Sequence, residues 1–133
     1  MKRYRMRIGS QLRESKTVEP VTNPYNGEVV GEVSVGTAQD MDDAIAAASR
    51  AFATLRHLPT HRRVAILEGV AARLQERAGE IARLMAEESG KPIRYCRGEV
   101  ARSVVTFSLG AGEARRVGGE VMPSDLEARA EGR

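Results

Sequence analysis

The sequence is poor in the residues that often anchor small folds. It has one cysteine, no tryptophan and only 4% aromatic residues among its 133 positions. A single cysteine excludes an intramolecular disulfide framework and fits a reducing compartment, so we expect a cytoplasmic protein. Hydrophobic residues still make up 41%. A core must therefore be built from Ala, Val, Leu, Ile and Met, which favours closely packed helices.

Long apolar runs and a strong charge imbalance are also missing. No run approaches the roughly 18 apolar residues of a membrane-spanning helix, and no apolar segment of a secretory signal follows the basic N-terminus. The net charge is +3, from 21 basic and 18 acidic residues, which disfavours nucleic acid as a partner. We interpret the basic excess near the N-terminus as charge that protects a strand edge. An RNA- or membrane-binding arm is the alternative, and a mitochondrial presequence stays open.

Residues 1–36 are predicted to form an antiparallel β-hairpin or meander. Near the start, apolar residues alternate with basic ones, which is the period-two pattern of a strand; they are Tyr4, Met6 and Ile8. The segment 18–22 is β-branched, and its Pro20 favours an edge strand. The turn residues 23–27, ending in Asn-Gly, predict a hairpin to a second strand at 29–35.

Residues 37–119 are predicted to form three or four antiparallel helices. Thr37 and Asp40 have the spacing of a capping box, and Thr60 is expected to cap the next helix. Gly79 marks a bend or break, and Gly90 ends a helix. Apolar residues follow at helical spacing, the first such stripe comprising Met41, Ala44, Ile45, Ala48, Ala51, Phe52 and Leu55. Residues 120–133 are polar after Pro123 and are interpreted as a truncated connector.

Several segments, in this order, resemble the N-terminal part of the aldehyde dehydrogenase superfamily. They are Asn-Pro-Tyr-Asn-Gly-Glu-Val-Val-Gly at 23–31, DMDDAIAAASRAF at 40–52, the helix ending Glu-Ser-Gly-Lys-Pro at 88–92, EVARSVVTF at 99–107 and GGEVMP at 118–123. The Glu-Val-Ala-Arg motif at 99–102 is most similar to the branch that oxidises lactaldehyde, phosphonoacetaldehyde or glyceraldehyde 3-phosphate. The last of these belongs to the non-phosphorylating glyceraldehyde-3-phosphate dehydrogenases. The first strand departs from the family, because Ile8-Gly9-Ser10 replaces the common Ile-Asn-Gly.

The resemblance implies an α+β piece of the α/β aldehyde dehydrogenase fold. In that family a cysteine thiolate attacks the aldehyde, a hydride passes to NAD or NADP, and a glutamate activates water to release the carboxylic acid. Relatives are several times longer and carry the nucleotide site, the glutamate and the cysteine downstream. We therefore expect this chain alone to be inactive, and a full-length enzyme to bind a small aldehyde and form a homo-dimer or homo-tetramer.

Five residues are candidates for a functional role. Cys96 is expected to be structural, because the family's nucleophile lies in a different motif. The resemblance places Arg102 on a helix beside the aldehyde entrance, where its guanidinium suits an anionic substrate end and Glu99 orients it. The alternative is a surface Arg102 paired with an acidic neighbour. The last two candidates, Val21 and Glu88, match positions that resemble a monovalent-cation site in some relatives. The alternative is that Val21 is an ordinary strand residue and Glu88 an ordinary carboxylate at a helix end.

Other patterns carry no site. His57 and His61 flank a proline without further ligands, so we interpret them as surface or helix-capping residues. Gly110 and Gly112 are not preceded by a strand and do not form a dinucleotide fingerprint. The rival hypothesis for the whole chain is a standalone helical interaction module without enzymatic activity, because its helices are coherent and capped.

Overall fold

The computed structural model describes residues 2–119, 123 and 128–130, and it combines a small β-region with four helices. The strands are β1 (Arg3–Tyr4), β2 (Met6–Ile8), β3 (Gln11–Arg13), β4 (Val18–Thr22) and β5 (Val29–Ser34). The helices are α1 (Ala38–Leu55), α2 (Thr60–Glu76), α3 (Ala78–Ser89) and α4 (Ile93–Arg116), followed by a 3₁₀ turn at Ala128–Ala130. This confirms the predicted α+β class. Most of the segment interpreted as a connector, 120–133, lies outside the described residues.

The central hairpin joins β4 to β5 as predicted. Its turn is closed by two backbone hydrogen bonds of 2.8 Å, one from Asn23 N–H to the Glu28 carbonyl and one from Gly27 N–H to the Asn23 carbonyl. Gly27 has a φ of 73°, a left-handed conformation that glycine adopts without strain. Strand β4 lies at the edge of the three-stranded sheet, in the order β1-β5-β4, so Pro20 occupies the edge position that its missing N–H favours.

The N-terminal strand prediction was partly wrong. The alternating residues 4–8 do not form one strand, because Arg5 separates β1 from β2 and the two belong to different sheets. Strand β1 pairs with β5 in parallel, whereas β2 and β3 form a separate antiparallel hairpin. The chain reverses twice between β1 and β5, once in each hairpin, so these two strands run in the same direction. Gly31 admits the ring of Tyr4, since a Cβ there would lie 2.9 Å from Tyr4 Cε2.

Helix α1 begins with the predicted capping box. The backbone N–H of Asp40 donates to Thr37 Oγ1 at 3.2 Å, and the backbone N–H of Thr37 donates to Asp40 Oδ2 at 2.9 Å. Two other helix boundaries differ from expectation. Thr60 is the first residue of α2 and makes no capping hydrogen bond, because Pro59 takes the position before the helix. The break between α2 and α3 falls at Arg77, two residues before Gly79.

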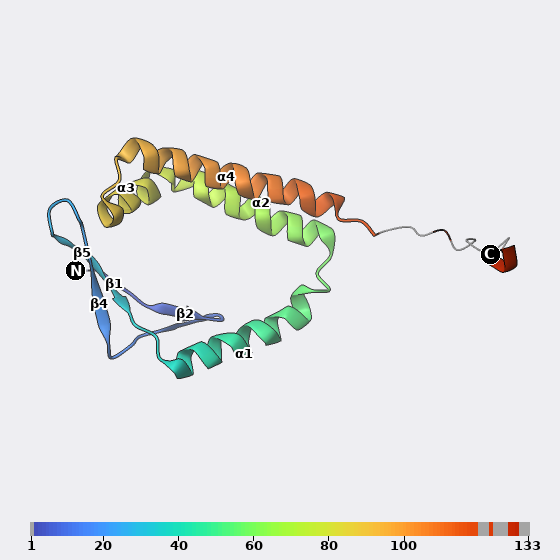
Figure 1. Ribbon diagram of the computed structural model, residues 1–133, viewed down its shortest axis with the longest axis horizontal. Helices are drawn as coiled ribbons and strands as arrows, with labels where there is room; N and C mark the ends of the chain where they lie inside the picture. Colours follow the sequence, from blue (N-terminus) through green and yellow to red (C-terminus); the bar gives the residue numbers. More distant parts are fainter. Residues whose placement is uncertain (1, 120–122, 124–127, 131–133) are drawn as a thin grey trace.

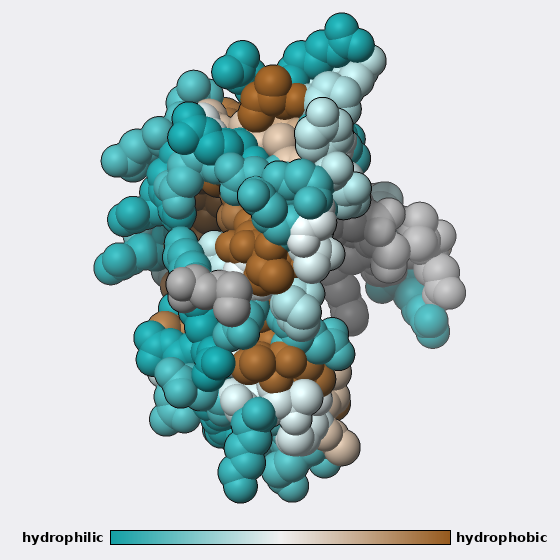
Figure 2. Space-filling view, turned by 90° about the vertical axis from the view of Figure 1, so that its left-hand side faces the viewer, coloured by the Kyte–Doolittle hydropathy of each residue, from teal (hydrophilic) through white to brown (hydrophobic). Residues whose placement is uncertain are grey.

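The interior lies among the last three helices. Helix α4 runs alongside α2 and then packs on α3, whereas α1 lies apart from them and approaches the β2–β3 hairpin (Figure 1). Small side chains dominate the buried set, which comprises Ile8, Val64, Ala71, Ala82, Cys96, Val100 and Ala111. Much apolar surface stays outside this interior, and Figure 2 shows apolar patches on the side that carries the strands. Within the described residues, none of the helices combines the length and the apolar character needed to span a membrane.

Gly90 joins the helices to the central hairpin. It ends α3 in the left-handed conformation with a φ of 69°, as the sequence predicted. A Cβ built on Gly90 would lie 2.8 Å from Cγ of Pro24, so the hairpin turn rests directly on this helix end. The contact requires glycine both for its backbone conformation and for its missing side chain.

Candidate functional site

Cys96 lies on the inner face of α4 and is completely buried. It forms a core cluster with Ala82 and Val100, and apolar residues of α3, including Ile81 and Met85, pack around it. Within the described part of the chain its one hydrogen-bond partner is the Lys91 carbonyl, 3.9 Å from Sγ. A nucleophile needs access to its substrate, which a completely buried side chain lacks. The position of Cys96 is that of a small hydrophobic core residue.

Glu99, one turn further along α4, is paired with a lysine and not with the candidate arginine. Lys91 Nζ donates to Glu99 Oε1 at 2.9 Å, across the connector between α3 and α4. This hydrogen bond is the main reason why the pKa of Lys91 is raised above its ordinary value. Glu99 is half-buried. The pair fixes the start of α4 against the end of α3, and the predicted orienting contact from Glu99 to Arg102 is not formed.

Arg102 is exposed on the outer face of α4. Among the described residues its guanidinium has no hydrogen-bond or ion-pair partner, so the acidic partners of the surface interpretation, Glu99 and Glu88, do not hold it. Helical spacing places Tyr95, Val105 and Leu109 on the same face. These three apolar side chains are all more than half exposed. In the described part of the chain, this face of α4 therefore sets an unpaired cation among exposed apolar side chains.

The sequence analysis missed this mixed face. The stronger apolar stripe of this helix lies on its opposite, inner side, where Val100 and Ala111 are buried. The signal was present, because positions 95, 98, 102, 105 and 109 repeat at three- and four-residue spacing. Gly98 interrupts the apolar series and Arg102 is charged, so the pattern looks polar when only the strongest stripe is considered.

The two residues predicted for a cation site line one hollow. Val21 on β4 and Glu88 on α3 are joined there by Tyr4, Val30, Gly31, Val33 and Leu84, and the hollow measures about 250 Å³. Glu88 supplies the only side-chain carboxylate among these residues. A hard cation needs about six or more oxygen ligands, so these side chains alone do not complete a site. Backbone oxygens would have to supply most of the ligands.

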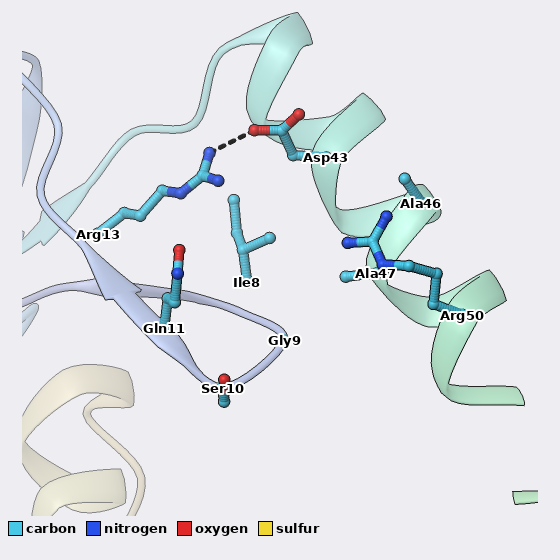
Figure 3. A pocket seen from close by; sticks show the side chains of 9 residues that line it. All are labelled: Ile8, Gly9, Ser10, Gln11, Arg13, Asp43, Ala46, Ala47 and Arg50. Atoms are coloured by element: carbon cyan, nitrogen blue, oxygen red, sulfur yellow. Dashed lines mark hydrogen bonds and ion pairs between the residues drawn. The ribbon is translucent and has the colours of Figure 1, made fainter. Parts of the chain in front are cut away.

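A further pocket lies between the β2–β3 hairpin and α1 (Figure 3). Its volume is about 390 Å³, and it is lined on the hairpin side by Ile8 and Arg13 and on the helix side by Asp43 and Ala47. Arg13 Nη1 lies 2.5 Å from Asp43 Oδ2 and 3.3 Å from Asp40 Oδ1. The hydrogen bond from Arg13 is the largest cause of the lowered pKa of Asp43. The Arg13–Asp43 pair holds the hairpin against α1, and Arg50 of the same helix adds a second positive charge to the lining.

A dinucleotide site does not fit the described residues. Gly110 and Gly112 lie inside α4, and no strand leads into them. The parallel strands β1 and β5 are not joined by a single crossover helix, because two hairpins lie between them. The strand–turn–helix unit that cradles a pyrophosphate is therefore not formed in this part of the chain.

Comparison with known proteins places the whole arrangement in one family. The model of the aldehyde dehydrogenase family matches residues 11–132. Lactaldehyde dehydrogenase of Methanocaldococcus jannaschii is 35% identical over 105 residues, which are 79% of this chain and 23% of that protein. The chain therefore spans about a quarter of the length of such relatives.

Solved structures agree with the sequence match. Aldehyde dehydrogenase 21 of Physcomitrella patens, in complex with the reaction product succinate, superposes with a TM-score of 0.92 at 39% identity, over 98% of this chain and 27% of that one. The NADP-dependent glyceraldehyde-3-phosphate dehydrogenase of Bacillus halodurans, complexed with NADP, has a TM-score of 0.88 at 29% identity, over 96% of this chain and 27% of that one. By family match, sequence identity and fold, the chain belongs to the aldehyde dehydrogenase family.

Proposed function

We propose that these residues form the N-terminal part of an NAD(P)-dependent aldehyde dehydrogenase, which oxidises an aldehyde to a carboxylic acid through a cysteine thiohemiacetal. The observation that carries the proposal is the superposition of 98% of the chain on a solved aldehyde dehydrogenase with a TM-score of 0.92. A relative solved with NADP supports the choice of a nicotinamide cofactor.

In this proposal the chain supplies neither the nucleophile nor the cofactor site. The sequence has one cysteine, and Cys96 is sealed between α3 and α4. The glycines of α4 lie within a continuous helix and cannot cradle a pyrophosphate. We therefore expect the 133 residues alone to be catalytically inactive. Their role is to present α4 and the strands to the residues that do the chemistry.

The substrate contact proposed for this chain is the outer face of α4. Arg102 would bind the anionic end of an aldehyde bidentately, and Val105 and Leu109 would contact its apolar part. A lactaldehyde dehydrogenase among the relatives fits the branch suggested by the Glu-Val-Ala-Arg motif. The contributions of Glu99 to substrate binding, and of Val21 and Glu88 to a monovalent-cation site, stay predictions.

The exposed stripe of α1 favours this proposal over a standalone interaction module. A self-contained helical domain would cover its apolar faces with its own residues, whereas none of the residues in α1 is buried. Such a stripe is what a segment of a larger enzyme would expose. We further propose a cytoplasmic location and a homo-oligomeric full-length enzyme. The single, unpaired cysteine is consistent with that location.

The test uses a chimaera beside the chain itself. Residues 11–119 replace the matching segment of the Physcomitrella patens enzyme, and NAD(P)H formation is followed with a panel of aldehydes. We expect the chimaera to be active and the 133-residue chain to be inactive with every aldehyde. An active chain whose turnover is lost in Cys96→Ser would refute the assignment of the nucleophile. A folded but inactive chimaera would argue against the enzymatic role of the segment.

A further inference from the structure

Helix α4 carries two glutamate–arginine pairs of identical spacing, and only one of them is an ion pair. Near the end of the helix, Arg116 Nη2 lies 2.6 Å from Oε1 of Glu113, three positions earlier. Glu99 and Arg102 have the same order and the same spacing, which brings two side chains of a helix within reach of each other. Among the described residues, however, no hydrogen bond or ion pair joins them. Helical spacing alone therefore does not explain why Glu99 and Arg102 stay apart.

The two pairs differ in whether a lysine from outside the helix reaches the glutamate. Lys91 Nζ donates to Glu99 Oε1 at 2.9 Å from the connector before α4. The Glu113 carboxylate, in contrast, has no partner other than Arg116 in the part of the chain that the structure describes. Lys91 is therefore the residue that draws Glu99 away from its helical neighbour.

The backbone on either side fixes the position of Lys91. Gly90 ends α3 in the left-handed conformation, and Pro92 takes the position before the first residue of α4 with a φ of −56°. The Lys91 carbonyl accepts the hydrogen bond of Cys96 in the first turn of that helix. The lysine side chain thus starts from a short, constrained connector, and its ammonium group is held beside Glu99.

Lys91, Glu99 and Arg102 form one electrostatic group. The hydrogen bond from Lys91 to Glu99, and then the charge of Glu99, raise the pKa of Lys91, whereas the positive charge of Arg102 acts on the same pKa in the opposite direction. Two cations therefore compete for one carboxylate, and the connector assigns it to Lys91. A guanidinium that is not engaged by a neighbouring carboxylate keeps its donors available for another anion.

We propose that Lys91 is a positioning residue for substrate specificity, which engages Glu99 and thereby keeps the guanidinium of Arg102 available for the anionic end of the aldehyde. This inference rests on the proposed function, in which Arg102 contacts the substrate. Lys91 acts through Glu99 and not by touching the substrate. The role of Glu99 is then the reverse of the one expected from the sequence, because its carboxylate is held away from Arg102 and does not orient it.

The first experiment follows arginine side-chain protons in the isotope-labelled 133-residue chain by NMR. In the native chain the guanidinium protons of Arg102 should exchange with water faster than those of Arg116, which is held by Glu113. In Lys91→Met the released Glu99 should pair with Arg102 and slow its exchange towards that of Arg116. Adding Glu99→Gln should restore the fast exchange. Unchanged exchange of Arg102 in Lys91→Met would overturn the proposal.

The second experiment measures KM in the chimaera for a carboxylated and an uncharged aldehyde. The side chains of Lys91 and Glu99 are 51% and 34% exposed, so their contact is a surface ion pair. Lys91→Met should therefore raise the KM of the carboxylated aldehyde about two- to fivefold, the size of one such pair. The kcat and the KM of the uncharged aldehyde should stay unchanged. Lys91→Arg keeps the pair and should behave like the native chimaera.

Two variants separate this role from a general effect of charge. Lys91→Met combined with Glu99→Gln should return the KM of the carboxylated aldehyde to its native value, because no carboxylate is left to occupy Arg102. A lysine that bound the substrate directly would show no such rescue. Arg83→Met is the matched control and should change neither KM, because it removes an exposed positive charge of α3 that has no partner in the described part of the chain.

The outcomes distinguish this inference from the proposed function. An active chimaera in which the double substitution fails to rescue, or in which Lys91→Met changes both KM values equally, would overturn the role of Lys91 alone. A folded chimaera that is inactive with every aldehyde would argue against the proposed function, and the proton exchange of Arg102 would still decide whether Lys91 controls Glu99.

Discussion

Arg13 on β3 holds Asp43 on α1 through an ion pair of 2.5 Å. This contact joins two residues that are 30 positions apart in the sequence, and Arg13 also donates to Asp40 of the same helix at 3.3 Å. It holds the start of α1 beside the hairpin, whereas Phe52 and Leu55 near the end of the helix line an apolar hollow with Ile66 and Leu67 of α2. The pair is exposed enough for solvent to screen it, so its value lies in orientation more than in stability.

Docking of α1 should weaken in acid. The pKa of Asp43 is lowered mainly by Arg13, and that of Asp40 mainly by the backbone N–H and then the hydroxyl of Thr37. A carboxylate with a lowered pKa stabilises the fold above its ordinary pKa and loses that contribution as the pH falls through the lowered value. The stability difference between the native chain and Arg13→Ala should therefore be full at pH 7 and shrink below the usual aspartate range. Urea unfolding at a series of pH values measures it. Arg7→Ala, which removes only a long contact to the Ser10 carbonyl, is the control.

Gly90→Ala should destabilise the chain by about 1–2 kcal/mol, the penalty for a left-handed residue with a side chain. The new Cβ would also meet Pro24 at 2.8 Å, so the hairpin must shift away from α3. Gly79→Ala is a matched contrast, because it lies inside α3 with nothing within 4 Å of the added Cβ. Because Gly79 is the second residue of α3, that change should stabilise through helix propensity by less than the roughly 1 kcal/mol of a site in the middle of a helix. Equal effects of the two substitutions in thermal unfolding would contradict this account.

Cys96 should resist thiol reagents until the chain unfolds. Its side chain is fully buried, so a disulfide reagent should label it at a rate that rises with denaturant in step with loss of helical signal. Cys96→Ser should lower the free energy of unfolding by about 1–3 kcal/mol, the range for burying a poorly paired hydroxyl. Rapid labelling of the native chain would mean that the interface between α3 and α4 opens locally.

In the active chimaera, Arg102→Leu should selectively impair anionic aldehydes. Loss of a charge-assisted contact removes about 1–3 kcal/mol of binding, and each 1.4 kcal/mol corresponds to a tenfold higher KM. Neutral aldehydes should be little affected, because they make no ion pair. The comparison of KM for a carboxylated and an uncharged aldehyde measures this, with Arg97→Leu, an exposed arginine away from this face, as a control on the same helix. Equal losses for both substrates would remove Arg102 from the substrate contact.

Local sequence signals predicted the parts of the fold that depend on neighbouring residues. The hairpin turn at 23–27, the capping box of Thr37 and Asp40, and the left-handed end at Gly90 each follow from backbone chemistry within a few positions. The parallel pairing of β1 with β5 was not predictable in this way, because it joins Arg3 to Glu32 across two reversals of the chain.

The candidate site was predictable only in part. Arg102 stood out as a charged residue in a recognisable motif. Its guanidinium is left without an ion-pair partner in the described part of the chain because Glu99 pairs instead with Lys91, eight residues away across the connector between α3 and α4. The break at Arg77 was expected at Gly79, because glycine is the usual local cause and the tertiary contacts of α3 with α4 are not visible in the sequence. Val21 and Glu88 come together because the hairpin folds over α3, a contact set by Pro24 and Gly90.

Helix α4 is 24 residues long, about 36 Å at 1.5 Å per residue, and both α2 and α3 pack along it. It spans the interruption at Arg77, so the two shorter helices, α2 and α3, both pack against α4. Neither can detach without exposing part of the same surface. Slowly exchanging amides in α2 and α3 should therefore lose their protection together, as one cooperative unit, while α1 exchanges earlier.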